Sequence, residues 1–152
     1  MVNLVHDPAP DSIDHPGLRA LYAYWEGCRA GRLLPGRRDL DPLDIPQLLP
    51  NIMLIDVASE VDMRYRLVGT ALVGRMGRDI TGLRVQDCYP GRNWEKILAD
   101  YLYAIRKRRP CLRRDVAGGP SSQSLADLRL LLPLAGDGER VDMLLAGAYW
   151  QN

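Results

Sequence analysis

The stretch RYRLVGTALVGRMGRDITG, residues 64–82, decides how the chain folds, because its glycines admit two interpretations. A strand-like run and a helix-like run with glycines between them are also typical of phosphate-binding loops. A dinucleotide site needs GxGxxG directly between a strand and a helix of a parallel βαβ unit. The glycines here stand at positions 69, 74, 77 and 82, and no Walker lysine follows. We therefore predict that they turn the chain: Gly69 ends a strand and Gly77 ends a helix.

The composition is that of one soluble globular domain of 152 residues, with 47% hydrophobic and 26% charged residues. A net charge of +1 creates no field that would attract nucleic acid or an anionic membrane. The three cysteines, Cys28, Cys88 and Cys111, form no CxxC pair, which argues against a disulfide framework or a zinc site. The first residues contain acids and prolines and no apolar run approaches about 20 residues, so we expect neither a signal peptide nor a membrane-spanning helix. We expect a cytoplasmic protein that binds neither nucleic acid nor membrane.

Residues 1–50 are expected to form an N-terminal arm, a helix and a proline-rich connector packed on the domain that follows. The arm, Met1–His15, is polar and contains prolines, so we expect it to be loose. A helix then begins at Pro16, with Asp14 as its cap, and stops near Gly31. The connector LLPGRRDLDPLDIPQLLPN holds four prolines and cannot form a long helix. The helix carries one apolar stripe: Leu18, Leu21, Tyr22, Trp25 and Cys28.

Residues 51–152 are expected to form the main domain. The run IMLIDV and the alternating run MRYRLVG predict a hairpin, with Met63, Tyr65 and Leu67 on its buried face. A short helix capped by Thr70 runs to Met76, and a longer one runs from 93 to about 109. Three further strands are predicted at CLRRDV, LADLRLLLPL and VDMLLAGAYW. This order of elements indicates an α+β fold with one antiparallel sheet.

A strand ending in RLVGT, a short helix and then GRDITG together resemble the middle of a PAS domain. The lead-in LYAYWEGCRAGRLLPGRRDLDPLDIPQLLPNIMLIDV resembles a bacterial family of short stand-alone PAS-like proteins long catalogued as a domain of unknown function. The resemblance covers roughly residues 18–149. It implies a five-stranded antiparallel sheet with short helices on one face and a small-molecule cavity between them. Two features depart from the pattern: the chain has no Phe, and Thr70 stands where many PAS domains carry Asn.

The cofactor-binding PAS subtypes provide a test of specific residues. Haem-binding PAS domains commonly place a ligand histidine on the longer helix, but His6 and His15 both lie in the N-terminal arm. Flavin-type photoreceptor domains need a reactive cysteine within a recognisable motif, which the VQDCYPGRN segment around Cys88 lacks. We therefore expect no cofactor and a colourless protein.

We expect any ligand to be a small apolar or aromatic molecule, because the residues assigned to inward faces are mostly apolar. Among them Tyr101 would supply the single polar contact. The predicted ligand-binding residues are Met76, Ile80, Ile97, Tyr101, Leu130 and Met143.

No catalytic motif was found, and we expect no enzymatic activity. The carboxylate pairs Asp39 with Asp41 and Glu95 with Asp100 are predicted on solvated faces. The basic run RKRRPCLRR is interpreted as a solvated helix end followed by an edge strand. The leading hypothesis is a stand-alone sensory or protein-interaction module that signals to an unidentified protein in trans, since the chain stops just after the last strand.

Two alternatives stay open. One is a small α+β enzyme, an isomerase or hydrolase, which would use a carboxylate in its cavity. The other is a dimerisation adaptor with a filled core and no ligand.

The last strand also predicts an assembly. It is apolar on both faces, and we expect an outer apolar patch that something must cover. The N-terminal helix is the natural cover, either on its own sheet or by pairing with a second chain in a homodimer. The residues assigned to this patch are Leu131, Leu144, Ala146, Ala148 and Trp150.

Overall fold

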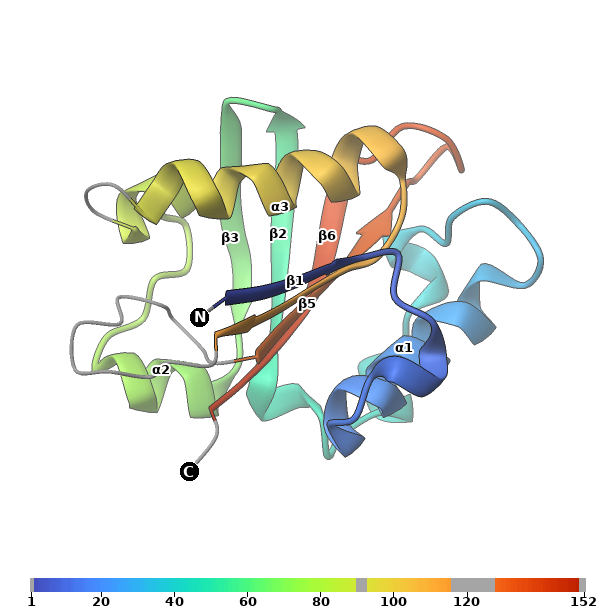
Figure 1. Cartoon of the computed structure of the whole chain (residues 1–152), viewed down its shortest axis with the longest axis horizontal. Helices are drawn as coiled ribbons and strands as arrows, with labels where there is room; N and C mark the ends of the chain where they lie inside the picture. Colours follow the sequence, from blue (N-terminus) through green and yellow to red (C-terminus); the bar gives the residue numbers. More distant parts are fainter. Residues whose placement is uncertain (1, 90–92, 116–127, 151–152) are drawn as a thin grey trace.

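One antiparallel sheet of six strands organises the protein (Figure 1). The computed structural model describes residues 2–89, 93–115 and 128–150, so the segment between the strands predicted at CLRRDV and LADLRLLLPL lies outside the described residues. The α+β class and the antiparallel sheet are confirmed. In spatial order the strands are β1 (Val2–His6), β4 (Cys111–Asp115), β5 (Leu128–Leu134), β6 (Met143–Tyr149), β2 (Ile52–Ser59) and β3 (Asp62–Val68).

The N-terminal arm was predicted to be loose, but its start forms a sixth strand of the sheet. β1 pairs with β4, so that Val5 lies opposite Leu112 and His6 opposite Cys111. The His6 ring also stacks on Tyr103 at a centroid distance of 3.8 Å. Five residues of mixed polarity carry little strand signal, and the partner edge that orders them lies more than 100 residues away. β4 is consequently an interior strand, not the edge strand predicted from RKRRPCLRR.

Helix α1 (Pro16–Arg29) begins where expected but with a different cap. The Nδ1 atom of His15 accepts hydrogen bonds from the backbone N–H groups of Gly17 at 3.1 Å and Leu18 at 3.4 Å. Burial lowers the pKa of His15, which keeps the imidazole neutral and able to accept. Asp14, the predicted cap, instead pairs with Arg114.

The remaining helices are short, except for α3 (Asn93–Lys107). Helix α2 (Thr70–Met76) ends at Gly77, whose φ of 78° is the left-handed conformation predicted there. Its N-cap is Gly69, so Thr70 is the first helical residue instead of the cap. No helix in the described ranges is both long and apolar enough to cross a membrane. The 3₁₀ turns are η1 (Pro10–Ser12), η2 (Arg37–Asp39), η3 (Pro42–Asp44), η4 (Leu49–Asn51) and η5 (Val85–Cys88).

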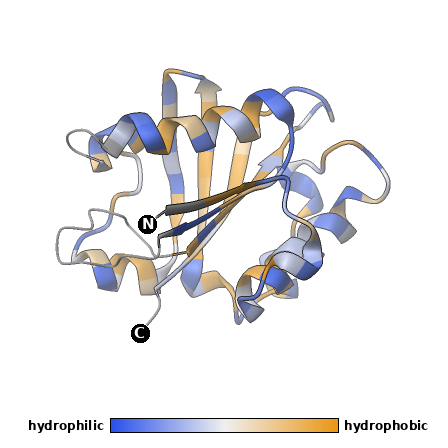
Figure 2. Ribbon diagram, in the orientation of Figure 1, coloured by the Kyte–Doolittle hydropathy of each residue, from blue (hydrophilic) through white to orange (hydrophobic). Residues whose placement is uncertain are grey.

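Cross-strand pairing defines the two faces of the sheet, because directly opposite residues share a face. Leu130 lies opposite Gly147, and a Cβ on Gly147 would come within 2.8 Å of Leu18 and Leu21 of α1. We call this the outer face. The alternate residues, among them Arg129, form the inner face, where α3 packs. Figure 2 shows hydrophobic residues along the central strands, while α3 alternates between hydrophobic and hydrophilic ones.

The predicted outer patch was assigned to the wrong face. Leu131 pairs with Ala146, and both lie on the inner face with Leu144 and Ala148. The strand β6 is buried on both sides, so its hydrophobic pattern does not show which face is which. Helix α1 does cover the outer face of its own sheet. There it buries Leu18, Leu21, Tyr22 and Trp25, and the Trp25 indole N–H donates to the Pro133 carbonyl at 2.9 Å.

A register shift moves Leu67 to the outer face. Leu54 lies opposite Leu67, whereas the next residue of β2, Ile55, lies opposite Tyr65. Arg66 is therefore an extra residue in β3, as in a β-bulge. Met63 and Tyr65 are buried as predicted, but Leu67 is 43% exposed.

Candidate functional site

The six predicted ligand-binding residues do not meet in one site. Tyr101 lies on the inner side, where the Arg129 guanidinium stands 5.3 Å from the centre of its ring. Leu130 and Met143 belong to the outer face by their register with Gly147 and Asp56. Ile80 and Ile97 are buried and Met76 is partly buried against the core. Two regions carry unusual chemistry: a buried polar cluster on the inner side and an apolar groove on the outer side.

The buried polar cluster joins α3 to β4 and β5. Asp100 of α3 is fully buried, and its carboxylate accepts from Arg113 through both Nε and Nη2. Arg129 Nη2 donates to the same carboxylate at 2.8 Å, and its Nη1 donates to the Tyr89 hydroxyl at 3.0 Å. Arg113 and Arg129 are only 7% and 4% exposed. The expectation that Asp100 lies on a solvated face was wrong, whereas the basic helix end at residues 106–109 is exposed as predicted.

The Tyr65 and Tyr101 hydroxyls and Arg129 Nε make no hydrogen bond of strict geometry among the described residues, but the Tyr65 hydroxyl lies close enough to those of Tyr89 and Tyr101 for hydrogen bonding to lower the pKa of both. Burial raises the pKa of Tyr65, Tyr89 and Tyr101, so all three phenols stay protonated. A buried donor without an acceptor costs about 1–3 kcal/mol.

Sequence reasoning missed this cluster although one signal was present. Arg129 interrupts the otherwise apolar run LRLLLPL, and this strand has a neighbouring strand on each side in the sheet. A charge inside such a strand needs a buried partner. Its partner is the carboxylate of Asp100, which lies 29 residues away on a helix. Polar neighbours in the sequence of that helix led to the prediction that Asp100 is solvated.

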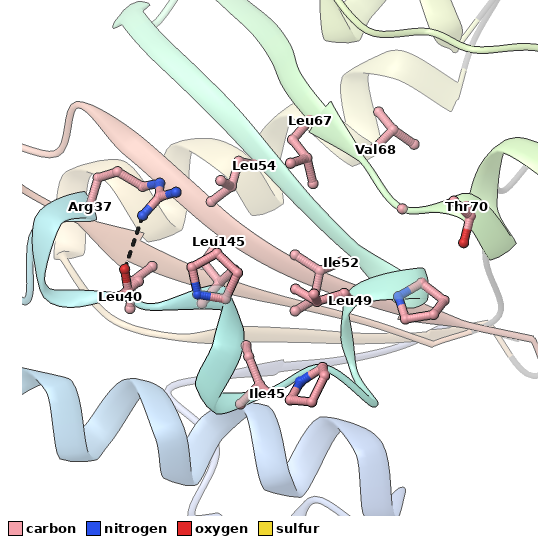
Figure 3. A pocket seen from close by; sticks show the side chains of 14 residues that line it. Arg37, Leu40, Ile45, Leu49, Ile52, Leu54, Leu67, Val68, Thr70 and Leu145 are labelled. Atoms are coloured by element: carbon pink, nitrogen blue, oxygen red, sulfur yellow. Dashed lines mark hydrogen bonds between the residues drawn. The ribbon is translucent and has the colours of Figure 1, made fainter.

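The apolar groove lies on the outer face beside the connector (Figure 3). It has a volume of about 380 Å³. Leu54 and Ile52 of β2, Leu67 of β3 and Leu145 of β6 form its floor and one wall. The other wall comes from the connector and consists of Leu40, Pro42, Ile45, Pro46, Leu49 and Pro50.

Within the part of the chain that the structure describes, polar side chains line the groove at its two ends. Arg37 stands at one end, where its Nη1 donates to the Leu40 carbonyl at 3.1 Å, and Thr70 stands at the other (Figure 3). Gly69 closes the Thr70 end, because any Cβ there would collide with the carbonyl oxygens of Leu49 and Pro50. The connector is thus seated directly on the end of β3, which shapes the groove.

Two sequence features produce this groove. Prolines hold the connector in short 3₁₀ turns, so it lies along the sheet without the continuous apolar stripe of a helix. The bulge in β3 turns Leu67 outward to form the wall. Helix α1 covers β5 and β6 and leaves this part of the outer face to the connector.

No group of three or more potential metal ligands occurs in the described ranges. Among the described residues Arg37 is the one charged side chain that lines the groove, and the inner cluster pairs its carboxylate with guanidiniums. The arrangement therefore offers an apolar groove on the outer face as a binding surface, whereas the polar cluster on the inner side is buried.

Comparison with known proteins agrees with the topology. A family model described as a PAS domain matches residues 13–149, which include α1 and the connector as well as the sheet. A search of the curated proteins found no match. The sixth strand β1 lies before the matched residues, and the other five form the PAS-like sheet expected from the sequence. The chain therefore belongs to the PAS domain family, whose domains are sensory and protein-interaction modules.

Proposed function

We propose that this PAS-type module binds a small apolar or aromatic molecule in the outer groove and signals to a partner protein in trans. The groove volume of about 380 Å³ is the observation that carries the proposal. Small-molecule sites in proteins measure roughly 300–1,000 Å³ and have mostly apolar walls with a few polar groups. The groove fits this description, with the polar groups confined to its ends.

The ligand class follows from the lining. Leu67 leaves 43% of its surface exposed at the groove, and burying such surface favours an apolar body. Arg37 at one end suits a ligand that carries a negative group there, such as a carboxylate or sulfonate. This assignment keeps the predicted ligand class but uses Leu54, Leu67 and Leu145 in place of the predicted residues.

The proposed signal leaves through the connector, because a molecule in the groove would contact the sheet and the connector together. The connector presents Leu43, which is 84% exposed, on its outer side. Tyr24 of α1 holds the same turn by donating to Asp44 at 3.0 Å. A ligand that shifts the connector would therefore change a surface that includes an exposed apolar residue and a polar link to α1.

A buried carboxylate would favour the enzyme alternative, and Asp100 meets the condition of burial. Its two oxygens, however, already accept three hydrogen bonds from buried guanidiniums, and Asp100 does not line the groove where a substrate would bind. The geometry therefore favours binding over catalysis. A homodimer stays part of the proposal, but the apolar stripe of α1 is buried on its own sheet and is not available for pairing.

The test uses anilinonaphthalene sulfonate, an aromatic probe with one negative group. Its fluorescence should report saturable binding to the folded protein. The Leu67→Trp variant should fill the groove and weaken probe affinity by about tenfold or more, the factor expected when about 1.4 kcal/mol of contact is lost.

Leu83→Trp is the matched control, because Leu83 is similarly exposed and does not line the groove. It should leave probe affinity unchanged. Equal affinities for the wild-type protein and both variants would rule out the groove as the binding site.

A further inference from the structure

A second pocket adjoins the apolar groove at Arg37, the side chain that stands at one end of the groove (Figure 3). This pocket has a volume of about 410 Å³ and a largely polar lining. We call it the polar pocket, and its lining residues are Arg37, Arg38, Asp56, Gly136, Asp142 and Met143. Because Arg37 lines both spaces, the groove and the polar pocket are neighbours on the outer face.

The strand register shows that the groove and the polar pocket share one floor. On the outer face Leu54 pairs with Leu145, and the next pair along the same two strands is Asp56 with Met143. The first pair lines the groove and the second lines the polar pocket. A molecule lying along the sheet would therefore pass from an apolar floor to a polar one within two residues, a distance of about 7 Å.

Backbone contacts hold the arginines of the polar pocket at the end of the sheet. The Ala135 N–H, just beyond β5, donates to the Pro35 carbonyl at 2.9 Å. A Cβ on Gly36 would come within 3.2 Å of the Ala135 carbonyl oxygen, so the connector lies close against this end of β5. The next two residues are Arg37 and Arg38, whose backbone positions are fixed by this contact.

The two guanidiniums of the polar pocket have N–H groups that can bind an anion. An arginine carries five N–H donors, and Arg37 uses Nη1 for the Leu40 carbonyl. Asp39, beside them in η2, forms its ion pair with Arg32 at 3.0 Å. In the described ranges neither Arg37 nor Arg38 forms an ion pair with a carboxylate. Both guanidiniums can therefore receive an anionic group from a ligand.

The two carboxylates of the polar pocket can accept further hydrogen bonds. Asp56 Oδ2 accepts from Arg66 Nε at 2.7 Å, and Asp142 Oδ2 accepts from the Gly136 N–H at 3.0 Å. A carboxylate offers about four lone-pair positions, so each can accept from another donor. The same carboxylates repel a simple anion. The polar pocket therefore suits a head group that combines an anionic group with an N–H donor.

We propose that the groove and the polar pocket form one elongated site for an acylated amino acid. Its acyl chain lies in the groove, its carboxylate binds the guanidiniums of Arg37 and Arg38, and its amide N–H donates to the pocket carboxylates. Guanidinium and carboxylate form strong charge-assisted hydrogen bonds. This site rests on the proposed function, because its apolar half is the same groove.

The test measures binding to the full chain by isothermal titration calorimetry, with N-octanoylglycine and 1-octanol as probes. Both probes carry an eight-carbon chain for the groove, and N-octanoylglycine adds the amide and the carboxylate. N-octanoylglycine should bind the wild-type protein about tenfold or more tightly than 1-octanol, the factor expected for added hydrogen bonds to charged groups.

The decisive variant is Arg38→Gln, because Arg38 lines the polar pocket but not the groove. Its affinity for N-octanoylglycine should fall by about tenfold or more. The Arg38 side chain is exposed, so the melting temperature should not change. Arg84→Gln is the matched control, because it removes the same charge from an exposed arginine that lines neither space. It should bind N-octanoylglycine as the wild type does.

The possible failures are distinguishable. If neither probe binds the wild-type protein, the groove is not a binding site, and the proposed function fails together with the elongated site. If both probes bind with equal affinity, the groove stands and the polar pocket takes no head group. Equal affinities of Arg38→Gln and Arg84→Gln for N-octanoylglycine would likewise overturn the elongated site alone.

Discussion

Asp100 shows how one residue can connect separate parts of the fold. Its carboxylate lies between Arg113 of β4 and Arg129 of β5, so a single side chain ties α3 to two strands. All three groups are removed from water, and each therefore depends on the others for its hydrogen bonds. Replacing one member leaves charges buried without compensation.

We predict that Asp100→Asn lowers the free energy of unfolding by about 3–5 kcal/mol, the usual cost of removing one partner of a buried ion pair. Urea denaturation followed by circular dichroism measures it. Asp87→Asn is the control, because the Asp87 pair with Arg84 is exposed on both sides and should matter by less than about 0.5 kcal/mol. Similar losses in the two variants would mean that burial does not govern the energetics of Asp100.

At the scale of elements, the contact between the connector and the start of α2 shapes the outer groove. Gly69 donates its N–H to the Ile52 carbonyl at 2.8 Å and lies directly against the backbone of η4. Glycine is needed at this position for lack of space and not for its backbone conformation, because a φ of −64° is one that any residue adopts. A side chain here would push the connector away from the sheet.

Gly69→Ala should therefore lower the free energy of unfolding by about 1–3 kcal/mol, the range for overpacking against an atom that cannot easily move. It should also weaken probe binding in the groove. Gly74→Ala offers a sharp contrast within α2, because no atom lies within 4 Å of a Cβ at that position. That variant should gain about 0.5–1 kcal/mol from helix propensity. Chemical denaturation measures the free energy of unfolding of both variants. A Gly69→Ala protein more stable than the wild type would contradict the packing argument.

For the whole molecule, α1 and the sheet form one core. The outer faces of β5 and β6 are apolar, and α1 buries them with a stripe of four large side chains. Without α1 this surface would be a contiguous apolar patch, which soluble monomers seldom expose. β1 has a different role, because it covers the edge of β4 and not a face.

Deletion of residues 1–31 should therefore cause aggregation, whereas deletion of residues 1–7 should remove β1 and leave a soluble protein with a lower melting temperature. Size-exclusion chromatography with light scattering distinguishes these outcomes and also tests the proposed homodimer in the full chain. If the protein lacking residues 1–31 stays soluble with an unchanged melting temperature, α1 does not cover the sheet in the way its packing indicates.

The sequence by itself determined the class of the fold and the order of its main elements. Alternation in MRYRLVG, the glycines after β3 and α2, and the long amphipathic helix α3 are local patterns. Local patterns follow from the periodicity of strands and helices, so they can be recognised without knowing the partners. The PAS resemblance depended on the same local order, and the family match bears it out.

Only the tertiary structure decided which face of each strand points to which layer. β6 is apolar on both sides, so its sequence does not show which residues face α1 and which face α3. The bulge at Arg66 turns Leu67 to the outer face, and the composition of β3 does not indicate it. β1 needed an edge supplied by distant residues. The Asp100 cluster likewise required residues from α3, β4 and β5 to meet. These features depend on pairings between distant segments, and the hydrophobic periodicity of one segment does not identify its partner, least of all in a strand that is apolar on both faces.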